Sequence, residues 1–182
     1  MSELAALVAR RLCHDLAGPA GAIATVVELM RDGIADPELQ SLLTESTATL
    51  LSTLRMHRFV LGGGDSSDYR ACLGDWIATR EGVALHWADE PERPPTQAAL
   101  LLGLAMIVAE AARGAATLTV ADTGVTITGA RLSLDAEVAA TLGGAAATSK
   151  GALAALLYQA AAGQGWTIVV DERPTQLELK LA

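Results

Sequence analysis

Apolar side chains recur at helical spacing over the first third of the chain. Wound at about 100° per residue, residues 2–31 place one set on a single stripe: Leu4, Val8, Leu12, Leu16, Ile23, Val27 and Met30. Pro19 lies inside this pattern, where its ring bends a helix and leaves the carbonyl of Asp15 without its usual donor. The pattern predicts one long amphipathic helix that ends at Asp32 and Gly33.

A second helix is expected directly afterwards. Asp36 suits the N-cap, Pro37 the first helical position and Glu38 the first turn. Its apolar face is formed by Leu39, Leu43, Leu50, Leu54 and Leu61. Two antiparallel helices of this kind leave wide apolar stripes uncovered, which predicts that two copies of the chain form a four-helix bundle. The alternative is that the remainder of the same chain covers the stripes.

The pattern changes after residues 62–68, a run of glycine, serine and aspartate that is typical of a linker. We therefore expect a helical hairpin over residues 1–62 and a second domain over residues 63–182. In the second domain, helices are predicted over residues 69–80, 96–112, 134–142 and 150–162, and strands over residues 83–88, 117–121, 125–128, 166–170 and 177–181. The predicted fold class is α+β: an antiparallel helical hairpin followed by a helix-covered, mixed and mostly antiparallel sheet.

The amino-acid composition argues against two classes of partner, nucleic acid and membrane. Half of the residues (51%) are hydrophobic, and the net charge is −8, with 21 acidic against 13 basic residues. Nucleic acid is therefore not expected as a partner, because phosphate binding needs clustered positive charge. Residues 151–170 carry no charge but contain glutamine and glycine, so they read as a helix and a strand and not as a membrane span. With no recognisable signal peptide, we expect a cytoplasmic protein with no membrane partner.

His14 is the candidate reactive residue. On the first helix it lies about 200° from the centre of the apolar stripe, so its side chain is expected in water. The residues that share its face over the next two turns are small: Ala17, Gly18 and Gly21. A glycine inside a helix costs about 0.5–1 kcal/mol of stability relative to alanine. The two glycines therefore predict a surface that is kept free of large side chains so that another macromolecule can approach His14 closely.

The neighbours of His14 suggest the chemistry. Arg10 and Arg11 stand one turn earlier, where a guanidinium could hold an anion near the ring. Asp15 adjoins the histidine and could accept a hydrogen bond from it. A free imidazole is largely neutral at pH 7, hence nucleophilic. The hypothesis is that His14 accepts a phosphoryl group, the alternative being an ordinary exposed histidine.

The two other histidines are interpreted as structural. His57 lies near the end of the second helix, beside Arg55 and Arg58, which is typical of a polar residue at the end of a bundle. His86 alternates with apolar residues in a predicted strand and is expected on the surface. Neither is expected to react.

Residues 11–19, Arg-Leu-Cys-His-Asp-Leu-Ala-Gly-Pro, resemble the H-box of sensor histidine kinases. That motif is a histidine followed by an acidic residue, an aliphatic residue, two variable residues and a proline. With Gly21-Ala22-Ile23 added, the string is more similar to ChpT-like histidine phosphotransferases of alphaproteobacteria. The order of hairpin, linker and α+β domain matches that family over the whole chain, and beyond Leu61 the resemblance is one of layout.

The resemblance implies a place in a phosphorelay. The family's histidine takes a phosphoryl group from the receiver domain of a hybrid kinase and passes it to response regulators. His14 would be the phosphorylated residue, with Asp15 and Arg11 at the flanking catalytic positions. The hairpin would form a homodimeric bundle, and Mg²⁺ would sit on the partner receiver, so that no cofactor belongs to this chain. The surface on which the receiver docks would comprise Arg10, Ala17, Gly18 and Gly21.

The second domain would then be a degenerate relative of the kinase ATP-binding domain. A working one needs an asparagine to hold Mg²⁺ and the phosphates, and this chain contains no asparagine. In the predicted helix over residues 96–112 the one carboxylate is Glu110, and Thr126 replaces the second glycine of an Asp-x-Gly-x-Gly loop that begins at Asp122. We therefore expect no ATP-dependent kinase activity. A kinase fragment and a non-catalytic, dimeric adaptor of the anti-sigma-like kind are the alternatives.

Overall fold

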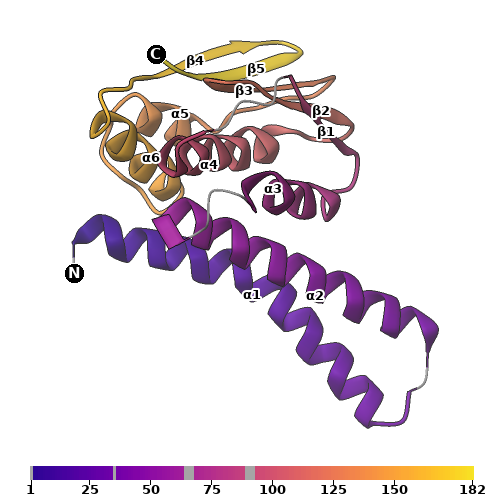
Figure 1. Cartoon of the computed structure of the whole chain (residues 1–182). Helices are drawn as coiled ribbons and strands as arrows, with labels where there is room; N and C mark the ends of the chain where they lie inside the picture. The colour runs from indigo at the N-terminus through magenta and orange to yellow at the C-terminus, as the bar shows by residue number, and fades with distance from the viewer. Residues whose placement is uncertain (1, 35, 64–67, 89–92) are drawn as a thin grey trace.

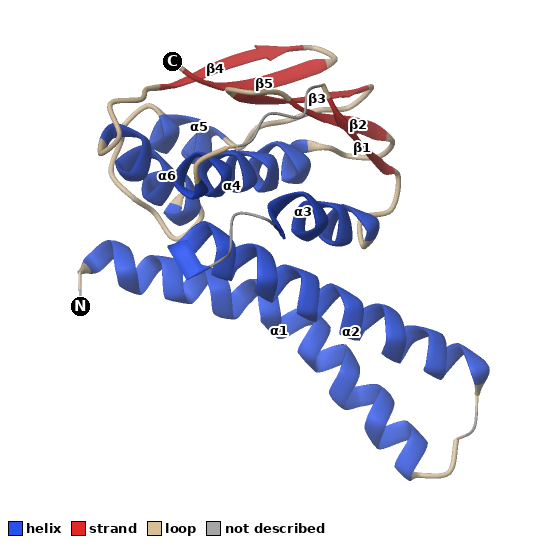
Figure 2. Cartoon of the chain, viewed as in Figure 1, coloured by secondary structure: helices blue, strands red, loops and turns tan. Residues whose placement is uncertain are grey.

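The computed structural model describes residues 2–34, 36–63, 68–88 and 93–182. A long helical hairpin is followed by a domain in which helices cover one face of a five-stranded sheet (Figure 1, Figure 2). The hairpin consists of α1 (Glu3–Arg31) and α2 (Pro37–Arg58), which η1 (Phe59–Gly63) extends. The predicted α+β class is therefore confirmed. Most of the predicted linker, residues 64–67, lies outside the described residues.

Capping side chains set the ends of the hairpin helices. The Ser2 hydroxyl accepts a hydrogen bond from the backbone N–H of Ala5 over 3.3 Å, so α1 begins at the following residue. The Asp36 carboxylate accepts from the N–H of Glu38 over 2.9 Å, as the Asp-Pro-Glu sequence predicts. Pro19 lies inside α1, which runs as one helix of 29 residues.

The second domain contains four helices and five strands in its described residues. Its helices are α3 (Tyr69–Ala78), α4 (Pro95–Ala111), α5 (Ala136–Leu142) and α6 (Ala152–Ala162). Its strands are β1 (Val83–Trp87), β2 (Ala116–Val120), β3 (Gly124–Gly129), β4 (Ile168–Arg173) and β5 (Gln176–Leu181). The strand order is β1-β2-β3-β5-β4, and only β1 and β2 pair in parallel. The sheet is therefore mixed and mostly antiparallel, as predicted.

Most boundaries in the second domain differ from the predictions by one to three residues, and two of these differences have a clear cause. The helix expected from residue 134 begins at Ala136, because the Asp135 carboxylate accepts from the N–H of Glu137 over 3.0 Å and caps it. The closing strand expected over residues 166–170 instead runs from Ile168 to Arg173, where it pairs with all of β5. Apolar periodicity alone did not place these ends, since capping and strand pairing decide them.

The core of the second domain lies between the sheet and α4. This helix contacts β2, β3 and β5 on one side and η1, α3 and α6 on others, so that it is apolar all round. Met56 and Phe59 from the end of the hairpin are buried in the same core, which fixes that end of the hairpin to the second domain. In the part of the chain that the structure describes, none of the helices combines the length and the apolar character that a membrane span requires.

The other end of the hairpin projects away from the second domain (Figure 1). Of nine large apolar side chains that are exposed in the described residues, seven belong to the hairpin, its loop and its extension: Val27, Met30, Ile34, Leu42, Leu51, Leu54 and Leu61. The second domain therefore covers only part of the apolar stripes, and the expected exposure of the remainder is observed.

Candidate functional site

His14 lies on α1, and its side chain is 84% exposed, as its helical phase predicted. Its Nδ1 atom is 3.3 Å from Oδ1 of Asp15. An ionised carboxylate can only accept a hydrogen bond. Nδ1 of His14 therefore carries the proton and donates a hydrogen bond to Asp15. The lone pair of the neutral ring is then on Nε2.

Asp15 is a half-buried carboxylate that three side chains hold. Besides His14, Nε2 of His57 donates to Oδ2 over 3.1 Å, and Nε of Arg11 donates to Oδ2 over 2.9 Å. Burial by itself would raise the pKa of Asp15, but the hydrogen bonds from His57, Arg11 and His14 outweigh it and lower that pKa to about 2. Asp15 is therefore ionised at neutral pH and remains an acceptor for His14.

His57 is the site residue that the sequence interpretation missed. Its side chain is 5% exposed and is bonded to Asp15, so the interpretation as a polar residue at the end of a bundle is wrong. The physical reason is that η1 continues the helix past His57, so this position is covered instead of ending in solvent. One signal was present: His57 follows Leu50 by seven residues and Leu54 by three, which puts it on the apolar stripe.

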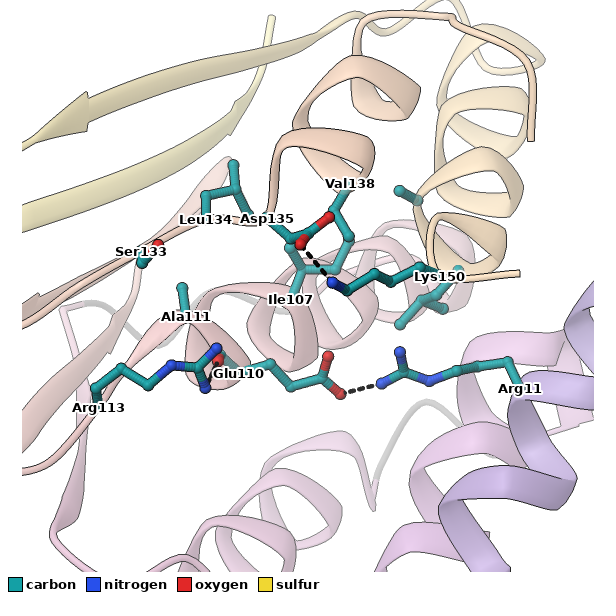
Figure 3. Close-up of a pocket in the computed structure, with 12 residues that line it drawn as sticks. Arg11, Ile107, Glu110, Ala111, Arg113, Ser133, Leu134, Asp135, Val138 and Lys150 are labelled. Carbon is teal, nitrogen blue, oxygen red and sulfur yellow. Dashed lines mark hydrogen bonds and ion pairs between the residues drawn. The ribbon is translucent and has the colours of Figure 1, made fainter. Parts of the chain in front are cut away.

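Arg11 joins the hairpin to the second domain. Its Nη2 donates to Oε1 of Glu110, on α4, over 2.5 Å, and the two side chains point toward each other in Figure 3. Burial would lower the pKa of Arg11, but the charges of Glu110 and Asp15 outweigh it and raise that pKa. Arg11 is thus engaged on two sides, whereas Arg10 is exposed, with Nη1 3.5 Å from Oγ of Ser149. Arg10 is the arginine with an open approach.

Arg11 and Glu110 border a cavity of about 110 Å³ between α1, α4, α5 and α6 (Figure 3). Across it, Nζ of Lys150 is 2.5 Å from Oδ2 of Asp135. The two carboxylates of this cavity are therefore each paired with a cation: Glu110 with the Arg11 guanidinium and Asp135 with the Lys150 ammonium. Among the described residues, no group of three or more histidine, cysteine, aspartate or glutamate side chains could hold a metal ion.

The small residues beside His14 form an open surface. Ala17, Gly18 and Gly21 are exposed on α1. A Cβ atom added at Gly18 or Gly21 would meet no other atom within 4 Å. These glycines are therefore not required by packing within the chain, which leaves approach from outside as a reason for their size.

Known proteins share part of this chain's sequence and its fold. No family model matches the chain. The protein phosphotransferase ChpT of Brucella abortus (strain 2308) is 33% identical over 73 residues, which are 40% of this chain and 35% of that protein. A solved bacterial phosphotransferase has a TM-score of 0.85 at 21% identity, over 100% of this chain and 98% of its own. The histidine kinase AdeS of Acinetobacter baumannii has a TM-score of 0.48 at 12% identity, over 92% of this chain and 95% of its own.

The two phosphotransferase matches carry different weight. The solved structure extends over the whole chain and shows that hairpin and second domain together form a fold that a phosphotransferase also has. The sequence match covers about a third of the length of ChpT. The predicted resemblance is therefore confirmed: the sequence is similar to ChpT over 73 residues, and the whole chain shares its fold with a bacterial phosphotransferase.

Proposed function

We propose that this chain is a histidine phosphotransferase of a phosphorelay, in which His14 takes a phosphoryl group from one receiver-domain aspartate and gives it to another. The observation that carries the proposal is the exposed imidazole whose Nδ1–H is bonded to an ionised Asp15. Such a ring presents a lone pair on Nε2 to solvent, where a partner can reach it. The phosphotransferase relatives support the same assignment.

The transfer follows from this geometry. Nε2 of His14 attacks the phosphorus of the phosphoaspartate in line, the N–P bond forms and the P–O bond breaks, and the aspartate leaves as a free carboxylate. The ring becomes positively charged, and the Asp15 carboxylate stabilises that charge through the Nδ1–H bond. The reverse sequence delivers the phosphoryl group to the next receiver. Mg²⁺ and most of the stabilisation of the phosphoryl charge would come from the receiver, so the chain needs no cofactor of its own.

The exposed apolar side chains of the hairpin support a homodimer. Leu54 on α2 and Leu61 on η1 are 46% and 48% exposed, and Val27 and Met30 on α1 are 42% and 41% exposed. A patch of this kind on a monomer favours association, and a second hairpin would bury it in a four-helix bundle. We propose this bundle as the functional assembly, with one His14 on each copy.

The receiver would dock on the open surface beside His14. Arg10 supplies a positive charge that suits the acidic pocket of a receiver, and Ala17, Gly18 and Gly21 leave room for it. The phosphorus must come within about 3–3.5 Å of Nε2 for in-line attack, which a bulky neighbour would prevent. Such exchange between receivers takes place in the cytoplasm, which we propose as the location.

Two other functions have less support. An ATP-dependent kinase would need a Mg²⁺ ligand where Glu110 is paired with Arg11, and the chain contains no asparagine. A non-catalytic adaptor would have no use for a histidine whose tautomer is fixed by a neighbouring carboxylate. Both alternatives are outcomes of the experiment that follows.

The test is transfer of label from a ³²P-phosphorylated receiver domain in the absence of ATP. We expect label on the wild-type chain that is stable to base and labile to acid, and none on the His14→Ala variant. Both proteins should have the same thermal stability, since the ring is 84% exposed. Binding of the receiver without label would indicate an adaptor, and label that requires ATP would indicate a kinase.

A further inference from the structure

The two oxygens of the Asp15 carboxylate have different partners. Oδ1 accepts from His14, while Oδ2 accepts from both His57 and Arg11. The two donors on Oδ2 therefore fix the plane of the carboxylate and direct Oδ1 toward His14. Arg11 and Asp15 lie on one helix, four residues apart, whereas His57 comes from α2, 42 residues further along the chain.

We propose that His57 is a positioning residue for the reaction of His14: from its buried place on α2 it holds Asp15 so that the proton of the His14 ring stays on Nδ1 and Nε2 stays free to attack. This inference rests on the proposed function. It assigns a role to a second histidine that touches neither the phosphoryl group nor the receiver.

Chemistry gives the reason for such a residue. A histidine side chain free in water prefers to carry its proton on Nε2, the atom that has to attack the phosphorus. A correctly directed carboxylate reverses this preference by accepting from Nδ1–H. His14 is too exposed for its ring to be held by packing, so the hydrogen bond to Asp15 has to hold it. The direction of that carboxylate then decides which tautomer is present.

Burial distinguishes His57 from Arg11 in this role. The His57 side chain is 5% exposed, against 19% for Arg11, and both line a small pocket whose other lining residues are apolar, among them Val8 and Leu153. Its Nε2–H is thereby aimed at one acceptor, Oδ2 of Asp15. Arg11 divides its hydrogen bonds between Asp15 and Glu110. His57 is therefore the donor dedicated to the carboxylate.

The test measures the His14 tautomer by NMR of ¹⁵N-labelled imidazole nitrogens in the full chain, at about pH 8.5, where histidine rings are neutral. His57→Gln keeps an N–H donor at the position of Nε2, and His57→Met fills the space without one. His86→Met, on the exposed side of β1, is the matched control and also helps to assign the three rings. The measurement needs no partner and no phosphoryl group.

We expect the wild type, His57→Gln and His86→Met to hold His14 with its proton on Nδ1, and His57→Met to move it toward Nε2. Phosphoryl acceptance should fall about 10–100-fold in His57→Met and recover in His57→Gln, the range typical for partners that orient a reactive histidine at a metal. A wild-type His14 with its proton on Nε2 would overturn the proposal, as would an unchanged tautomer in a folded His57→Met.

Two further outcomes remain decisive. If His57→Met does not fold, the spectra of the wild type and His57→Gln decide: Nδ1–H in both supports the proposal, and Nε2–H in either overturns it. If the wild-type chain accepts no label from any receiver, the proposed function fails, while the tautomer measurement still determines whether His57 positions His14.

Discussion

The hairpin and the second domain bury opposite kinds of residue. The second domain encloses large apolar side chains that are almost fully buried, such as Trp76, Leu104 and Ile127. On α2 of the hairpin, the buried residues include the small polar Ser46 and Ser52, while the large apolar Leu42, Leu51 and Leu54 are exposed. The second domain is therefore closed by its own core, whereas the hairpin lacks a partner for its apolar face.

An ion pair joins the two regions beside the candidate site. Glu110 binds Arg11, which in turn binds Asp15. Helix α4 of the second domain is thereby linked, through Arg11, to the carboxylate beside His14.

The largest effect should come from a charge on the open face of the hairpin. Leu54→Asp removes one half-exposed leucine from each copy and should weaken a dimer by about 1.5–3 kcal/mol through lost burial alone, since full burial of a leucine contributes about 1.5–3 kcal/mol. The charge that it adds to the interface should weaken the dimer further. Sedimentation should show dissociation at concentrations where the wild type is a dimer. Ala48→Asp, which puts the same charge at an exposed position outside the apolar stripe of α2, should remain dimeric. A wild type that is monomeric at micromolar concentration would contradict the bundle.

A cavity in the core of the second domain should lower stability almost as much, and this loss should not depend on whether the chain is a dimer. Leu104→Ala, on α4, empties a fully buried site and should lower the free energy of unfolding by about 2–5 kcal/mol in chemical denaturation. Val169→Ala, at a position that is 47% exposed on β4, should change it by less than about 0.5 kcal/mol. Equal losses of unfolding free energy in the two variants would mean that Leu104 is not buried in a core of the second domain.

Lowering the pH should show how much the ionised Asp15 carboxylate stabilises the fold. Because its pKa is lowered from 3.8 to about 2, the ionised carboxylate stabilises the fold above about pH 4, and this stabilisation is lost as the pH falls through about 2. The amount is on the order of 2 kcal/mol. The difference in free energy of unfolding between the wild type and Asp15→Asn should therefore shrink by about that amount between neutral pH and about pH 2. A difference that does not vary with pH would indicate an unperturbed carboxylate.

The smallest change in stability should accompany a large change in transfer. Gly18→Leu adds a side chain on the exposed face beside His14 and should leave stability unchanged or raise it by up to about 1 kcal/mol, because leucine is the better helix former. Receiver binding and transfer should drop sharply. Ala140→Leu, an exposed change on α5, should alter neither. Transfer at the wild-type rate in Gly18→Leu would place the docking surface elsewhere.

Local sequence patterns predicted part of the fold and part of the candidate site. Helical phase predicted the exposure of His14, and adjacency predicted its bond to Asp15, because both depend on residues within one helix. Capping residues likewise predicted the start of α2.

The remaining contacts join residues that are far apart in the sequence. His57 lies 42 residues from Asp15, and Glu110 lies 99 residues from Arg11, so no helical spacing could reveal either pair. The first pair forms where α1 and α2 pack together, and the second joins α1 to α4 of the second domain. Long-range packing therefore supplied the half of the site that local patterns could not.

The proposed mechanism places the phosphoryl group on Nε2 of His14. It is tested most directly by ³¹P and ¹⁵N NMR of the chain after transfer from a phosphorylated receiver. We expect one phosphohistidine signal, with phosphorus bonded to Nε2, that is absent from His14→Ala and present in His86→Ala. A signal that persists in His14→Ala, or phosphorus bonded to Nδ1, would contradict the account.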